Sequence, residues 1–164
     1  MKWREIKMTL VIGYGNELRG DDAVGPRVAA AVNEWNFDGV IAQAVPQLTP
    51  ELAEPISRAQ LAVFVDAAAA PNTEEVQITR LNPSVPSDLD SHLGDPRALL
   101  ALSRAVYGRC PTAWLITIPT LGFDFGAPLS ALAGRGVRTA LTAIKKLSRR
   151  RLAHTRPYHR GGAA

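Results

Sequence analysis

Short apolar runs separated by segments with helical spacing place the strongest limit on how this chain can fold. Four runs are almost continuously apolar, and a fifth alternates apolar with polar residues: 8–14 (MTLVIGY), 39–45 (GVIAQAV), 61–67 (LAVFVDA), 112–121 (TAWLITIPTL) and 75–81 (EVQITRL). Continuous apolar runs of this length are typical of strands buried on both faces of a parallel sheet. The sequence therefore predicts five strands, of which 75–81 is an edge or half-exposed strand.

The segments between these runs have the spacing and end signals of helices. From Asp22 to Trp35 the apolar residues recur at steps of three and four, and acidic residues stand at the start, where they favour a helix N-terminus. Further helices are predicted at 49–56, 96–106 and 128–150, the last weakened by Gly134 and Gly136. Alternating strands and helices predict an α/β fold with three layers, α/β/α, around a mostly parallel, twisted five-stranded sheet.

The length of 164 residues is that of one ordinary domain. We expect a single α/β domain over residues 1–150 and a basic, flexible tail over 151–164. All 15 acidic residues lie in positions 1–124, whereas the charged residues of positions 125–164 are all basic. Such a tail could bind nucleic acid or an acidic partner, but it lacks interleaved aromatic residues, so a solvated helix end is the favoured interpretation and no nucleic acid is expected.

The composition argues against a membrane protein and a secreted one. No stretch reaches the roughly 18 uninterrupted apolar residues of a membrane span, and the N-terminal segment leads into the first strand without a small-residue cleavage site. The single Cys110 cannot form an internal disulfide, and no nucleophile motif surrounds it. We expect a soluble, cytoplasmic protein with no membrane partner, in which Cys110 is a core thiol.

The loop GYGNELRGDDAVG, residues 13–25, follows the first strand and could bind either an anion or a cation. Its first two glycines match a dinucleotide fingerprint, but Leu18 takes the place of the third, and no phosphate-loop Lys follows. Glu17, Asp21 and Asp22 would repel a pyrophosphate at close range. The loop therefore favours a cation as its ligand.

Three side chains could complete a cation site at this edge. Asp22 begins the first helix, Asp66 ends the third strand and His92 lies in the long loop after the fourth strand. The carboxyl ends of parallel strands are where function gathers in such folds, and two carboxylates with one imidazole leave room for a fourth ligand. The residues alone leave an alternative open: Asp22 as a partner of the helix dipole and His92 as an ordinary loop histidine. Asp66 is harder to explain this way, because a carboxylate after LAVFV is costly to bury without a partner.

Several segments together carry a resemblance to a known family. The first lies in the loop after the first strand and consists of Gly13, Gly15, Asn16, Leu18, Asp21, Asp22 and Gly25. Further segments lie at 47–54 (QLTPELAE), 64–67 (FVDA), 91–102 (SHLGDPRALLAL) and 118–130 (IPTLGFDFGAPLS). With these residues the chain resembles the hydrogenase maturation endopeptidases, which trim the C-terminal extension from the large-subunit precursor of nickel-iron hydrogenases, and the loop residues match that family's opening signature. The resemblance implies the three-layer fold described above, and it assigns Asp22, Asp66 and His92 to the family's metal-binding and catalytic positions.

The resemblance also implies a reaction. Nickel is delivered in the substrate, so that the protease recognises nickel-loaded precursor; zinc or cadmium could take its place in a crystal. Asp21 or Glu17 would accept a proton as general base, or else these carboxylates are simply neutralised by the helix dipole and backbone donors. Asn16 would shape the turn, and Gly13 and Gly15 would let a peptide approach the strand end.

We expect a monomer whose partner is the precursor. Three alternatives stay open: a same-fold endopeptidase for another precursor, a nickel-binding maturation chaperone that does not cleave, and a nucleotide-binding domain.

Overall fold

The computed structural model describes residues 8–68, 72–85 and 94–153, with the side chains of 151–153 excepted. The predicted helices and strands are all present. In chain order the elements are β1 (Thr9–Tyr14), η1 (Gly20–Ala23), α1 (Val24–Glu34), β2 (Val40–Val45), η2 (Pro50–Leu52), α2 (Ala53–Arg58), β3 (Leu61–Ala68), β4 (Gln77–Leu81), α3 (Pro96–Tyr107), β5 (Thr112–Pro119) and α4 (Ala131–Ala153).

The five strands form one sheet in the order β2-β1-β3-β5-β4. All neighbours are parallel except β4, which runs antiparallel to β5 at the edge. The first four residues of β4 are exposed, whereas the first five residues of β3, at the centre of the sheet, are fully buried. This arrangement confirms the mostly parallel five-stranded sheet and the half-exposed character of the fourth strand.

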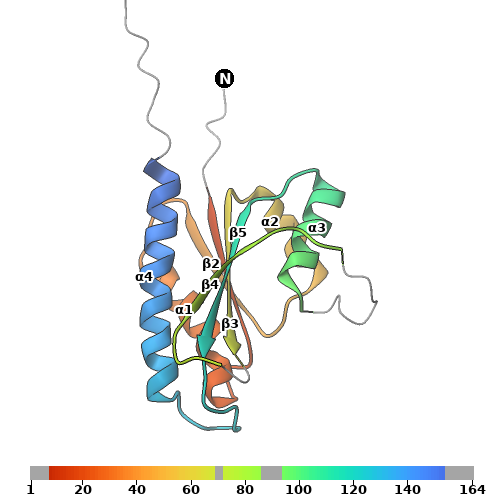
Figure 1. Ribbon diagram of the computed structural model, residues 1–164. Coiled ribbons are helices and arrows are strands. Elements are labelled where there is room, and N and C mark those ends of the chain that lie inside the picture. The colour runs from red at the N-terminus through yellow and green to blue at the C-terminus, as the bar shows by residue number, and fades with distance from the viewer. Residues whose placement is uncertain (1–7, 69–71, 86–93, 154–164) are drawn as a thin grey trace, which may run out of the picture.

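Helices cover both faces of the sheet and complete the three layers (Figure 1). On one face, α1 and α4 pack through Val28, Val32 and Ile144 against Val63 and other strand residues. On the opposite face, α2 and α3 pack through a second apolar cluster that includes Ile56, Leu100 and Phe64. Among the described residues, no helix has both the length and the apolar character needed to cross a membrane.

The last helix extends further than predicted, and one of the two glycines expected to weaken it, Gly136, is a packing residue. The helix α4 runs without a break from Ala131 to Ala153, past the predicted domain boundary at residue 150. A Cβ atom at Gly136 would lie only 2.4 Å from Cγ2 of Ile118, so this glycine lets α4 approach β5 closely. The predicted basic tail lies outside the described residues from 154 onward.

Candidate functional site at the carboxyl end of the sheet

The glycines of the first loop bring the start of α1 directly against the sheet. A Cβ atom at Gly25 would lie 2.4 Å from the carbonyl oxygen of Tyr14 and 2.8 Å from that of Val65. A Cβ atom at Gly13 would lie 1.9 Å from the carbonyl oxygen of Gly25. The space beside Gly13 is thus filled by the chain's own helix, which corrects the expectation that a bound peptide occupies it.

The turn between β1 and η1 orients Asp22. Gly15 has a φ of 142°, a value that side chains rarely adopt, and a Cβ there would collide with the Asp22 carbonyl. The Asn16 N–H donates to Oδ2 of Asp22 at 2.9 Å, and Oδ1 of Asn16 accepts from the Leu18 N–H at 2.9 Å. The second bond agrees with the turn-shaping role expected of Asn16, and the first ties the Asp22 carboxylate to the loop.

Asp66 lies near the end of β3, and its carboxylate is half-buried. One carboxylate oxygen, Oδ1, accepts from the Ala67 N–H at 2.8 Å, and Tyr14 acts as a side-chain hydrogen-bond partner. Burial raises the pKa of Asp66, and the nearby charge of Asp22 raises it further, whereas the bonds from Tyr14 and Ala67 act in the opposite direction. Two carboxylates from distant parts of the sequence are therefore close enough for the charge of one to act on the other.

Tyr14 connects this pair to the start of α3. Burial is the main cause that raises the pKa of Tyr14, followed by the negative charge of Asp66, so its hydroxyl stays protonated and serves as a donor. The charge of Asp95 also acts on Tyr14. Asp95 is the N-cap of α3, where its Oδ1 accepts from the Arg97 N–H at 2.8 Å. The N-cap of α3 is thus close enough to the two strand ends for its charge to act on Tyr14.

Asp21 has a structural role in the described part of the chain. The residue is only 2% exposed. It accepts from the Leu121 N–H at 2.8 Å and from both the N–H and the hydroxyl of Ser130 at 2.7 Å. Burial alone would raise the pKa of Asp21, but these donors outweigh it and lower the pKa. Of the two roles weighed for Asp21, neutralisation by donors is the one that this geometry favours over general base.

The structure brings Asp22 and Asp66 together, but it does not describe the third predicted ligand. His92 lies in residues 86–93, outside the described residues. Within the ranges that the structure describes, no group of three His, Cys, Asp or Glu side chains could hold a metal ion. Among the described residues, Asp66 also forms no salt bridge with a Lys or Arg side chain. The two carboxylates are two of the three predicted ligands, and both the cation site and the role of His92 stay predictions.

Sequence reasoning missed two polar side chains that share a face of the sheet with Asp66. Tyr14 follows Gly13, which pairs with Val65, and Thr117 pairs directly with Asp66. Both are polar residues near the carboxyl ends of mostly apolar strands. That pattern in the sequence could have identified them, because a polar side chain just before a strand's carboxyl end lies at the edge where ligands bind.

The chain shares its fold with solved hydrogenase maturation proteases. The maturating endopeptidase HybD from E. coli superposes with a TM-score of 0.69 at 19% identity, covering 87% of this chain and 93% of HybD. The [NiFe] hydrogenase maturation protease HycI from Thermococcus kodakarensis gives a TM-score of 0.66 at 22% identity, with 86% and 92% covered. An uncharacterized protein from Wolinella succinogenes is 27% identical, with a TM-score of 0.58 and 87% and 96% covered.

Comparison by sequence adds no family assignment. No family model matches the chain, and no curated protein sequence matches it either. The structural likeness spans most of each chain and agrees with the motifs in residues 13–25 and 64–67. The chain therefore has the three-layer fold of the hydrogenase maturation endopeptidases, the family that its sequence resembles.

Proposed function

We propose that this protein is an endopeptidase that removes the C-terminal extension of a nickel-iron hydrogenase large-subunit precursor after nickel insertion. The observation that carries the proposal is the interaction between Asp22 and Asp66. These residues hold two of the three metal-binding positions implied by the family resemblance. They lie 44 residues apart in the sequence, yet the charge of Asp22 acts on the Asp66 carboxylate near the carboxyl end of β3.

The electrostatics of the pair support a positively charged ligand. The Asp66 carboxylate is half-buried and has an acidic neighbour, and both features make its charged form unfavourable in the free protein. A bound cation would stabilise that charged form. Carboxylate oxygens and an imidazole nitrogen suit nickel or zinc, and this set lacks the thiolates that would form a closed structural site. The donor set thus fits an ion that arrives with the substrate and leaves with the product.

In the proposed reaction, Asp22, Asp66 and His92 bind the nickel ion held in the precursor. Such an ion polarises a carbonyl group or lowers the pKa of a water molecule. Tyr14 keeps its proton and holds the Asp66 carboxylate in place. Glu17 is exposed on the same loop as Asp22 and is the remaining candidate for accepting a proton. Asp21 holds the loop after β5 against the loop after β1.

Only Leu93 and Gly94 separate His92 from Asp95 in the sequence. Asp95 acts on Tyr14, which in turn acts on Asp66. Asp95 is therefore close enough to Tyr14 for its charge to act there, and this proximity supports His92 as the third ligand of the proposed site. We further propose that the protein acts in the cytoplasm as a monomer.

A processing assay with purified components tests the proposal. The precursor is incubated with this protein once in its nickel-loaded form and once without nickel, and the mass of the large subunit is measured over time. We expect loss of the C-terminal extension only from the nickel-loaded precursor. Cleavage independent of nickel would contradict the recognition step, and the absence of cleavage from either form would contradict the proposed activity. Stable binding to loaded precursor without cleavage would favour the maturation chaperone instead.

A further inference from the structure

A row of side chains crosses the sheet at the level of Asp66. The register pairs Asp66 with Thr117 on β5, and Thr117 with Gln77 on β4. Paired residues of neighbouring strands present their side chains to the same face, and here that face is the one covered by α2 and α3, because Phe64 and Leu115 belong to its cluster. Tyr14 also packs against this cluster. The candidate catalytic residue Asp66 is thus part of a row of polar side chains that extends through Thr117 to Gln77 at the β4 edge.

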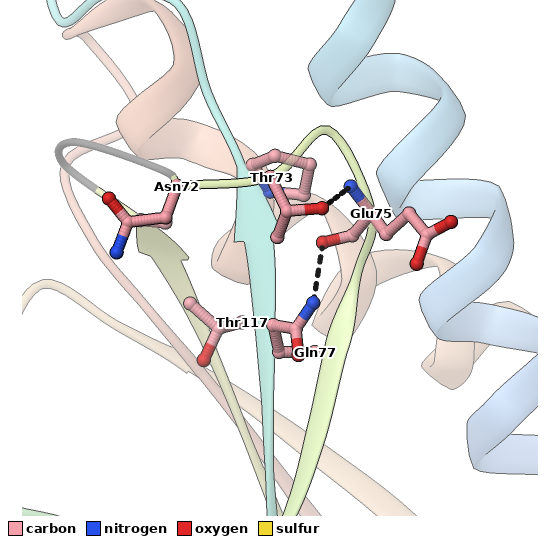
Figure 2. Close-up of a pocket in the computed structure, with 7 residues that line it drawn as sticks. Asn72, Thr73, Glu75, Gln77 and Thr117 are labelled. Atoms are coloured by element: carbon pink, nitrogen blue, oxygen red, sulfur yellow. Dashed lines mark hydrogen bonds between the residues drawn. The ribbon is translucent and has the colours of Figure 1, made fainter.

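A pocket of about 380 Å³ lies at the outer half of this row (Figure 2). Its lining comes from the ends of β3 and β5, from the start of β4 and from the segment before β4: Ala68, Asn72, Thr73, Glu75, Gln77, Thr117 and Pro119. Ala68 and Pro119 are register partners. The Thr120 hydroxyl donates to the Ala68 carbonyl and ties these two strand ends together. The floor of the pocket is therefore fixed by the sheet.

The pocket offers neutral hydrogen-bonding groups. Thr73 and Gln77 are engaged with the backbone of Glu75, through bonds of 3.1 Å and 3.4 Å. Figure 2 shows the Glu75 carboxylate turned away from Asn72 and Thr117. The Asn72 amide and the Thr117 hydroxyl have no hydrogen-bond partner among the described residues, so both can donate to a ligand and accept from it.

We infer that this pocket binds the backbone of the substrate peptide beside the scissile bond, and that Thr117 and Asn72 are the residues that hold it. The inference rests on the proposed endopeptidase function. Neighbouring strands are about 4.8 Å apart, so the distance from Asp66 past Thr117 to Gln77 is about 10 Å, which an extended peptide spans in about three residues. A pocket lined by amides and hydroxyls suits the N–H and C=O groups of such a peptide, which need partners once they leave water.

Two conservative variants test the inference, with a third as a matched control. Thr117→Val keeps the shape of the side chain and removes the hydroxyl, and Asn72→Ala removes the amide. Thr79→Val makes the same change as the first variant on an exposed residue of β4 that does not line the pocket. The measurement is the rate of processing of nickel-loaded precursor as a function of its concentration, together with the melting temperature of each variant.

We expect each pocket variant to raise KM by about three- to tenfold, the effect of one lost hydrogen bond, while kcat stays at the wild-type value. A change in KM alone identifies a binding contact made equally in the ground state and the transition state. Thr79→Val should match the wild type in both constants. Wild-type KM in both pocket variants would overturn the inference and leave the proposed function standing. The absence of cleavage by the wild type would overturn the proposed function and this inference with it.

Discussion

Two aspartates at the carboxyl end of the sheet, Asp21 in the first loop and Asp66 in β3, have opposite consequences for stability. The Asp21 carboxylate is buried and receives three hydrogen bonds, from Leu121 and Ser130. Asp66, by contrast, is half-buried beside another acid, and burial raises its pKa. The first arrangement stabilises the fold, whereas the second costs free energy and is of the kind found at functional sites.

Replacing Asp21 should therefore weaken the fold. In Asp21→Asn the neutral amide loses charge-assisted bonds, and its NH₂ group faces at least one donor. We expect the free energy of unfolding to fall by about 2–4 kcal/mol. Urea unfolding followed by circular dichroism measures it. Asp124→Asn is the control, because Asp124 is an exposed carboxylate in the loop that Asp21 holds; a loss of equal size in both variants would refute the structural role of Asp21.

Cys110 is half-buried against the second apolar cluster rather than inside the core, and it should behave as an unreactive thiol. Burial raises the pKa of Cys110, and the charge of Arg104 lowers it by less. Since the thiolate is the reactive form, a raised pKa leaves less thiolate at neutral pH and moves the rise in reactivity to higher pH.

We predict slow alkylation of Cys110 by iodoacetamide at pH 7, with a rate that is still climbing above pH 9. The same protein unfolded in urea provides the reference rate, because there the thiol titrates near its ordinary value. Equal rates in the folded and unfolded protein at pH 7 would show that the thiol is not protected.

At the scale of elements, two glycines in α4 that look alike in the sequence have different roles. A Cβ atom at Gly134 would meet nothing within 4 Å, whereas one at Gly136 would lie 2.4 Å from Cγ2 of Ile118. Ile118 is fully buried and cannot move aside freely. Helical periodicity cannot separate these two cases, because the distinction depends on which residue of β5 faces the helix.

The two alanine substitutions should therefore change stability in opposite directions. Gly134→Ala should raise the free energy of unfolding by about 0.5–1 kcal/mol through helix propensity. Gly136→Ala should lower it by about 1–3 kcal/mol through overpacking against Ile118. The midpoints of urea unfolding of the two variants, measured side by side, check this. Stabilisation by both would mean that α4 does not press against β5 at Gly136.

Across the whole molecule, the fold was predictable because its signals are local. Runs such as LAVFVDA and the spacing of Val24, Val28 and Val32 indicate their own secondary structure, and alternation of the two types implies the layers. The order of the strands and the antiparallel direction of β4 depend on contacts across the sheet, which no single segment specifies.

The candidate site was predictable only in part. Asp22 and Asp66 belong to recognisable sequence motifs. Their proximity could be expected because each follows or ends a parallel strand, and the carboxyl ends of such strands lie at the same edge of the sheet. Tyr14 and Thr117 are recognisable in the sequence as polar residues near strand ends, but their place beside Asp66 depends on the strand register, which the sequence does not specify. The role of Asp21 depends on Ser130, which lies 109 residues away in the sequence. Sequence reasoning weighed this carboxylate both as a base and as a partner of backbone donors, but it could not identify which residues supply those donors.

The most direct test of the central claim is the rate at which Asp66→Asn cleaves nickel-loaded precursor, measured together with its stability. The substitution removes a carboxylate from a half-buried site next to another acid, while its amide oxygen can still accept from Ala67 and Tyr14. We predict a free energy of unfolding no lower than that of the wild type and a cleavage rate reduced by at least about 100-fold, since a charged ligand of the nickel is lost. Cleavage of the nickel-loaded precursor at the wild-type rate would contradict the account.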